Sequence, residues 1–279
     1  MVKFGKRNRL KVSRIVDFGA YLEADFGKEI LLPKRYISEP LTPGDEVDVV
    51  VYTDSEDRPV ASTETPYAYV DEFAFLNVVA VTKVGAFLDW GLPKDLLVPF
   101  SEQRSRMKEG GRYLVYLYLD HSSGRIAASA KIEKFIGNVI PEYVKGQKAG
   151  VLVFDKNDVG YRCIVDNRHF GILYNDEVFS PVNIGDRLDA YVKQVRPDGK
   201  IDLMLGGRAD VRTNTLADKI FKAIKSNGGK LEVSDKSSPE EIKQAFMCSK
   251  KDFKKAIGHL LKDGKISVSE DKRTLFARK

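Results

Sequence analysis

Aromatic rings close to a glycine, with a basic side chain further along, are the residues of this sequence best suited to chemistry. Phe18 and Tyr21 flank Gly19, and Arg58 follows later. An exposed ring can stack on the flat face of any nucleobase, and a guanidinium or ammonium group can hold a phosphate. A single ring in a strand is more often a core residue. Recurrence of the whole pattern is what favours a surface that holds unpaired bases.

The pattern occurs three times. The recurring glycines are Gly19, Gly85 and Gly160. They lie 66 and 75 residues apart, and a second turn glycine precedes Arg58, Arg125 and Lys200 by 14, 15 and 15 residues. Two landmarks in register indicate an array of small modules rather than one large enzyme fold. Three further rings lack this support and are interpreted as packing or inter-domain contacts: Trp90, Tyr116 and Tyr118.

Short runs with an apolar residue at every second position fill each module, as at Val47, Val49 and Val51. This period is typical of half-buried strands, and a glycine within such a run marks a bend, a bulge or a close backbone approach. A small closed barrel needs such a feature to turn its corner. We therefore predict a mainly β chain with three tandem five-stranded oligonucleotide-binding (OB) barrels, over residues 1–66, 67–143 and 144–207.

Beyond residue 207 the apolar period changes to between three and four, which indicates helices. Ser238 to Glu241 is a capping box with proline in the first turn, and Ser249 to Asp252 is a second box. Two short apolar runs near Ile266 and Leu275 follow as strands. Helices followed by a two-stranded hairpin predict an α+β winged-helix domain over residues 208–279.

The last quarter of the chain carries the whole positive excess. Residues 211–279 contain 17 Lys and Arg against 9 Asp and Glu, which is +8 (17 minus 9), whereas the entire chain has a net charge of +6. The candidate phosphate contacts on the third helix and the hairpin are Lys250, Lys251, Lys254, Lys255, Lys272 and Arg273. Lysine runs are often only solvated faces, and that helix has no Asn, Gln or Arg to read base edges. We expect non-specific phosphate binding there.

The order of segments in each module resembles the RNA-binding S1 motif. The resemblance is carried by Phe18-Gly19-Ala20-Tyr21, by the turn at Gly44-Asp45-Glu46-Val47 and by the run from Gly124 to Ser129. In that family two aromatics stack on bases, and a basic residue at the start of the last strand meets the backbone. The resemblance implies these roles for Phe18, Tyr21 and Arg58 in the first module, and for Phe87 and Arg125 in the second.

The third module departs most from the S1 pattern. Val159 and Arg162 stand where the two aromatics would be, Lys200 keeps the basic position, and Tyr174 takes the place of a histidine frequent in the family. The modules are therefore not expected to bind equally. The remaining candidate nucleic-acid contacts are Arg162, Tyr174, Lys200, Lys34 and Arg35.

Over nearly its full length the chain resembles the bacterial conserved virulence factor B (CvfB-like) family. The resemblance rests on the order of the domains and on the run from Ser249 to Gly258. It implies a cytoplasmic RNA-binding protein without catalysis that influences the expression of virulence genes. The partner is then single-stranded RNA, and duplex DNA or a protein partner for the winged helix stays open.

The sequence has no evident catalytic or metal-binding motif. His121, His169 and His259 lie in different modules, without a Cys or carboxylate at metal-ligand spacing. Cys163 and Cys248 form no disulfide framework, and no segment approaches the roughly 20 apolar residues of a membrane span. We expect no enzyme activity and no cofactor. A winged-helix DNA-binding transcription regulator and a metal-dependent RNA-processing enzyme built from dispersed carboxylates remain alternatives.

Overall fold

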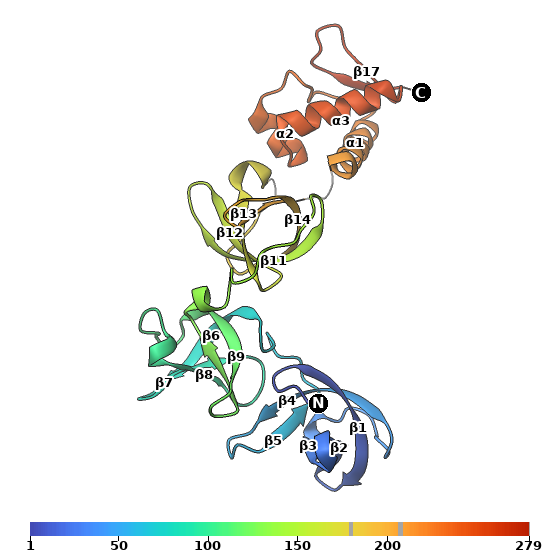
Figure 1. Ribbon diagram of the computed structural model, residues 1–279. Coiled ribbons are helices and arrows are strands. Elements are labelled where there is room, and N and C mark those ends of the chain that lie inside the picture. The colour runs from blue at the N-terminus through green and yellow to red at the C-terminus, as the bar shows by residue number, and fades with distance from the viewer. Residues whose placement is uncertain (179–180, 206–208, 279) are drawn as a thin grey trace. The chain divides into compact units, whose positions relative to one another are not determined.

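The alternating segments of the chain close into three barrels that share one strand order (Figure 1). The computed structural model describes residues 1–178, 181–205 and 209–278. Around each barrel the order is first, second, third, fifth and fourth strand. The third and fifth strands pair in parallel, and the other neighbours pair antiparallel. The predicted mainly β architecture of three five-stranded barrels followed by a winged helix is confirmed.

The strands of the first barrel are β1 (Arg7–Val16), β2 (Gly19–Glu23), β3 (Glu29–Pro33), β4 (Glu46–Thr53) and β5 (Pro59–Ser62). Those of the second are β6 (Phe73–Val81), β7 (Gly85–Asp89), β8 (Leu96–Pro99), β9 (Arg112–Asp120) and β10 (Arg125–Ser129). Those of the third are β11 (Lys148–Lys156), β12 (Gly160–Val165), β13 (His169–Tyr174), β14 (Arg187–Val195) and β15 (Ile201–Met204).

The recurring glycine begins the second strand of each barrel and allows the third strand to come close. A Cβ atom at Gly19 would lie 2.2 Å from the carbonyl oxygen of Leu32. The corresponding distances at Gly85 and Gly160 are 2.3 and 2.4 Å, again to a backbone oxygen of the third strand. Real Cβ atoms do not come this close to another heavy atom, so only glycine fits. The close backbone approach predicted at these positions is confirmed.

A β-bulge interrupts the first strand of each barrel at the same place. The pairing with the second strand shifts between Val12 and Arg14 in the first barrel, and at the corresponding residues of β6 and β11. The extra residue bends the strand and re-aims the side chains that follow it. In the first barrel this shift sets Arg14 directly opposite Tyr21.

The chain divides into two units, Met1–Ile136 and Gly137–Lys279, which are described separately. Within the first unit, the two barrels share buried contacts. Tyr52 of β4 meets Trp90 edge to face, with ring centroids 6.4 Å apart, and Trp90 Nε1 donates a hydrogen bond to the carbonyl oxygen of Lys94 at 2.7 Å. Trp90 therefore packs between the first two barrels. The contact with Tyr52 agrees with the packing or inter-domain role that the sequence predicts for this ring.

Three helices and a small sheet form the C-terminal domain: α1 (Ala209–Ser226), α2 (Pro239–Phe246), α3 (Lys250–Lys262), β16 (Lys230–Leu231), β17 (Ile266–Val268) and β18 (Leu275–Ala277). The caps predicted for α2 and α3 are confirmed, because the Ser238 hydroxyl accepts from the Glu241 amide and the Ser249 hydroxyl from the Asp252 amide. The predicted boundary at 207/208 lies outside the described residues.

The sheet of the winged helix has one strand more than the predicted hairpin. β16 pairs with β18 on the edge opposite β17, through Lys230 and Leu231. Two residues are too few to show an alternating pattern, so only the pairing with a distant segment reveals this strand. No helix in the described part of the chain is long and apolar enough to span a membrane.

Candidate nucleic-acid interface

Two rings of the first barrel lie on its outer face. Tyr21 pairs with Leu31 of β3, which pairs in parallel with Val60 of β5, so the three residues form one row across the strands. Tyr21 and Leu31 alternate with buried neighbours, and their side chains therefore point outward. Phe18 precedes β2, is 58% exposed and meets Tyr21 edge to face at 6.4 Å. The structure brings these two predicted rings together on a surface.

Arg14 is a third member of this surface, which the sequence reasoning missed. Its guanidinium carbon lies 3.9 Å from the centre of the Tyr21 ring, and its Nη2 is 2.8 Å from the carboxylate of Glu29. Hydrogen bonds from Arg14 and then Ser13 hold the pKa of Glu29 below its usual value. Because the bulge at Ser13 shifts the pairing, strand alternation alone gives no signal for this contact.

Lys34 and Arg35 lie beside the ring pair, in the short turn η2 (Lys34–Tyr36) that follows β3. The Lys34 amide donates a hydrogen bond to the carbonyl oxygen of Phe18 at 2.9 Å, which ties this turn to the exposed ring. Both side chains are exposed, and the Arg35 guanidinium lies 4.7 Å from the centre of the Tyr36 ring. The turn that carries these two predicted cations is thus bonded to the backbone of Phe18.

Four of the predicted barrel cations already face a carboxylate. Arg58 binds Asp54 and Glu56, both at 2.8 Å, within the β4–β5 hairpin. Lys200 binds Asp198 at 3.0 Å, also within its own hairpin. The remaining pairs are Arg125 with Asp57 and Arg162 with Asp155. These cations are largely neutralised by their neighbours, so the barrels attract phosphate less than their Lys and Arg suggest.

The outer row of the second barrel lines a pocket of about 430 Å³. Phe87 takes the place of Tyr21 in this row and pairs with Leu97 of β8, which pairs with Ala127 of β10. Opposite Phe87 on β6 stands Ala80, where the first barrel has Arg14, so no guanidinium covers this ring from that position. Arg125 lines the same pocket, which places the predicted ring and the predicted cation together.

Phe100 of the second barrel is a further candidate ring that the sequence reasoning missed. It directly follows Pro99, as Lys34 follows Pro33 in the first barrel. Its side chain is half-buried, and the guanidinium carbon of Arg106 lies 3.9 Å from the centre of its ring. The position immediately after the third strand, compared between modules, is the signal that could have found it.

The row of the third barrel that corresponds to Tyr21 and Phe87 begins with an arginine instead of a ring. Arg162 takes the place of the ring, and its row continues through Ile172 to Asp202. Arg162 binds Asp155 at 3.0 Å and lies 4.8 Å from the centre of the Phe154 ring. This face therefore offers an ion pair where the other two barrels offer an aromatic ring.

Tyr174 of the third barrel belongs to a network around a buried carboxylate. Asp202 is only 4% exposed and accepts hydrogen bonds from Arg196 at 2.7 Å, Gln194 at 2.6 Å and the Tyr174 hydroxyl at 3.2 Å. The Arg196 side chain also contacts the Tyr174 hydroxyl. These bonds hold Tyr174 half-buried, which leaves it less free to stack on a base than Phe18.

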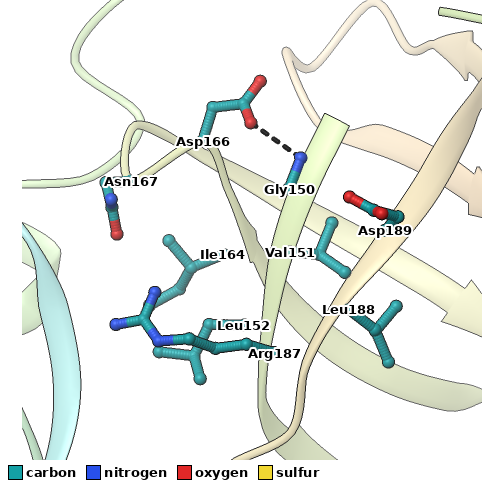
Figure 2. A pocket seen from close by; sticks show the side chains of 9 residues that line it. All are labelled: Gly150, Val151, Leu152, Ile164, Asp166, Asn167, Arg187, Leu188 and Asp189. Carbon is teal, nitrogen blue, oxygen red and sulfur yellow. Dashed lines mark hydrogen bonds between the residues drawn. The ribbon is translucent and has the colours of Figure 1, made fainter. Parts of the chain in front are cut away.

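A hollow of about 380 Å³ on the third barrel contains none of the predicted contacts. Figure 2 shows its lining, which includes Gly150, Val151 and Leu152 of β11 and Arg187, Leu188 and Asp189 of β14. The carboxylate of Asp166 accepts from the Gly150 amide at 2.8 Å and from the Tyr143 hydroxyl at 2.8 Å. Asp166 therefore holds the β12–β13 turn against β11 and against Tyr143.

The predicted lysines of α3 differ from these four barrel cations in having no carboxylate partner among the described residues. Lys251, Lys254 and Lys255 are exposed on α3, and in the described residues none of them forms an ion pair. Lys250 instead donates to the carbonyl oxygen of Ser237 at 2.8 Å. Exposed Lys272 and Arg273 lie in the β17–β18 turn, and residues 209–278 contain no ion pair to either side chain. This domain presents unneutralised positive charge.

Comparisons with known protein families match one segment in the first barrel and one in the winged-helix domain. A family described as S1 domain matches residues 4–64, which contain the Phe18 and Tyr21 surface. A family described as CvfB-like winged helix domain matches residues 218–275. The C-terminal domain is a CvfB-like winged helix. The CvfB-like resemblance stated from the sequence is confirmed by these matches and by the relatives of the chain.

Relatives of this chain match most of its length. It is 29% identical over 272 residues to the uncharacterized protein YitL of Bacillus subtilis, covering 94% of this chain and 90% of YitL. It is 26% identical over 245 residues to conserved virulence factor B of Staphylococcus aureus, covering 85% and 81%. A solved multidomain protein with nucleic acid binding domains, from Streptococcus pneumoniae, is 26% identical with a TM-score of 0.41, covering 99% and 98%.

Side chains that bind metal ions do not gather in the described residues. No group of three or more His, Cys, Asp and Glu there is placed to hold an ion. Cys163 and Cys248 are both buried and reduced, and burial raises the pKa of the Cys163 thiol to about 12. A thiol with so high a pKa is a poor nucleophile, so Cys163 packs as a core side chain.

Proposed function

We propose that this chain is a non-catalytic protein that binds single-stranded RNA in the cytoplasm and regulates gene expression after transcription. The observation that carries the proposal is the exposed Phe18 ring beside Tyr21, on the outer face of a barrel matched by the S1 domain family. The bases of a duplex are stacked within it, so a protein ring reaches the flat face of a base only in an unpaired strand.

Two kinds of surface divide the binding between them. The first two barrels contribute rings, and each stacked base contributes about 1–3 kcal/mol without regard to its identity. The winged helix contributes exposed lysines without carboxylate partners, which attract the phosphates of any strand. Stacking therefore selects unpaired strands, and the basic domain strengthens binding at low salt.

RNA rather than DNA is proposed because the chain contains an S1 domain, and the S1 motif is an RNA-binding motif. The regulatory role is proposed from the relatives named conserved virulence factor B. Binding without a catalytic group suits a regulator, since occupation of a transcript by itself changes access for other proteins.

Fluorescence anisotropy with strands of about 20 nucleotides, long enough to span more than one barrel, tests this proposal. The full chain is titrated with single-stranded RNA, with single-stranded DNA of the same sequence and with the matching DNA duplex, each with and without Mg²⁺. We expect tightest binding to the RNA single strand and no cleavage. Tighter binding to the duplex would favour a winged-helix DNA regulator, and Mg²⁺-dependent cleavage would favour an RNA-processing enzyme.

A further inference from the structure

Arg125 is held by a carboxylate from a different barrel. The corresponding cations of the first and third barrels, Arg58 and Lys200, bind acids of their own hairpins. Arg125 of the second barrel instead binds Asp57, which lies in the β4–β5 hairpin of the first barrel. Both barrels belong to the first unit, Met1–Ile136.

The acid of the second barrel's own hairpin is engaged elsewhere. Asp120 pairs across the β9–β10 hairpin with Arg125, but its carboxylate accepts hydrogen bonds from the Ser122 and Ser123 hydroxyls at 2.8 and 2.6 Å. These bonds hold the pKa of Asp120 below its usual value. Among the described residues the Asp120 carboxylate forms no ion pair with Arg125, and Arg125 binds a carboxylate of the first barrel instead.

Asp57 contacts a second cation of the same pocket. Lys94 Nζ lies 3.3 Å from the Asp57 carboxylate and donates to the carbonyl oxygen of Asp54 at 2.5 Å. A hydrogen bond from Arg125, followed in size by one from Lys94, keeps the pKa of Asp57 below its usual value. The hairpin thus places one oxyanion between two cations, which is how a phosphate would bind.

The pocket beside these cations has the lining of a base-binding site. Its wall combines the Phe87 ring with Leu97 and Trp90 from the second barrel, and it includes Tyr52 of the first. A volume of about 430 Å³ lies within the range of small-molecule sites. A flat, apolar ligand with an anionic group at one end matches this arrangement.

The other charges of the pocket limit the ligand to one anionic group. Asp95 and Asp120 both line it. Burial, and then the charge of Asp89, raise the pKa of Asp95. Further phosphates would meet these carboxyl groups, which disfavours a free nucleoside triphosphate and favours one phosphodiester of a strand.

We propose that this inter-barrel pocket is a subsite for one unpaired nucleotide, whose base lies against Phe87 and whose phosphodiester replaces the Asp57 carboxylate on Arg125 and Lys94. The inference rests on the proposed single-strand binding. It adds that the first barrel masks the cations of the second, so a bound strand must displace the hairpin that carries Asp57.

The masking contact is weak enough for a strand to displace. The side chains of Arg125 and Asp57 are 57% and 44% exposed, and exposed ion pairs contribute little to stability. A phosphodiester has the same charge as a carboxylate, and the base adds stacking that Asp57 lacks. When a strand is present, Arg125 and Lys94 therefore bind the nucleotide in preference to the Asp57 carboxylate.

Asp57→Asn and Glu56→Gln form a matched pair of variants that tests the inference. Both remove one negative charge from the same hairpin, but Glu56 binds Arg58 and not the pocket cations, and Arg58 keeps Asp54 as its partner when Glu56 is replaced. Asn tolerates the positive φ of 62° at position 57, so the turn is retained. We expect Asp57→Asn to bind the RNA single strand about two- to five-fold more tightly than Glu56→Gln, and Arg125→Gln to abolish that gain in the double variant.

The outcomes separate this inference from the proposed function. If the wild type binds the RNA single strand and the two hairpin variants bind it equally, the masked subsite is wrong and single-strand binding stands. If Asp57→Asn gains affinity equally with and without Arg125, the gain is not made in the pocket and the inference is also overturned. If neither the wild type nor Asp57→Asn binds a single strand, both proposals fail. Thermal unfolding of each variant checks that the barrels remain folded.

Discussion

The guanidinium of Arg14 covers one face of the Tyr21 ring, 3.9 Å from its centre. Phe18 meets the same ring in a T-shaped arrangement, with centroids 6.4 Å apart, and is itself 58% exposed. A base that joins this surface therefore meets a more exposed ring at Phe18 than at Tyr21, where Arg14 covers one face. The two rings are equivalent in the sequence pattern but not in the structure.

Phe18→Ala should weaken binding of single-stranded RNA more than Tyr21→Ala. Loss of one stacked base costs about 1–3 kcal/mol of binding free energy. Because Arg14 covers one face of Tyr21, the cost of Tyr21→Ala should lie toward the lower end of that range. Anisotropy titrations measure both variants, with Tyr67→Ala as the control because Tyr67 is 63% exposed and lies between the barrels. Equal affinity of Phe18→Ala and wild type would rule out stacking at this ring.

Replacing the exposed lysines of α3 should reduce the salt dependence of binding. Each phosphate contact on a single strand adds about 0.7 to the slope of log affinity against log salt, so the triple variant Lys251→Gln, Lys254→Gln, Lys255→Gln should lose up to about 2. The control carries the same charge change on α1, at Lys219, Lys222 and Lys225. If both variants keep the wild-type slope, the winged helix does not touch the strand.

The third barrel should lose stability as the pH falls below the ordinary imidazole range. His169 is buried, its Nδ1 has no hydrogen-bond partner among the described residues, and burial followed by the charge of Arg168 lowers its pKa from 6.5. Between the lowered and the ordinary pKa the unfolded chain binds a proton that the folded chain does not, so stability rises with pH through that window. His169→Phe should flatten this dependence in thermal unfolding between about pH 7.5 and 5.5.

Exposed His121 offers the control for that measurement, because its replacement by Gln changes the histidine count without changing the core. An equal flattening in His121→Gln and His169→Phe would assign the pH dependence to something other than burial of His169.

Trp90→Ala should destabilise the first unit by about 3–5 kcal/mol, the usual cost of truncating a large buried aromatic. Trp90 is 1% exposed and packs against Tyr52 of the other barrel. Urea unfolding followed by circular dichroism gives the loss, and Trp90→Phe should lose less because most of the contact is kept. A loss no larger than that of Tyr67→Ala would show that this contact does not couple the barrels.

Local signals in the chain were enough to predict the architecture. The recurring Gly19 pattern predicted three modules, period-two runs predicted strands, and Ser238 and Ser249 predicted the starts of two helices. These signals act between residues that are close in sequence, because strand alternation and helix capping depend on neighbouring side chains. The strand β16 escaped them because its two residues are recognised only by pairing with β18.

The composition of the candidate surface depended on contacts between residues far apart in the chain. Arg125 and Asp57 are 68 residues apart, and nothing near either residue in the sequence indicates that they meet. The β-bulge of β1 sets Arg14 over Tyr21, although simple alternation gives no sign of it. Residue types and their spacing therefore indicated candidate rings and cations but missed Arg14 and Phe100. Barrel closure and the packing of neighbouring barrels determined which of them are open, covered or neutralised, because these properties arise only when distant segments come together.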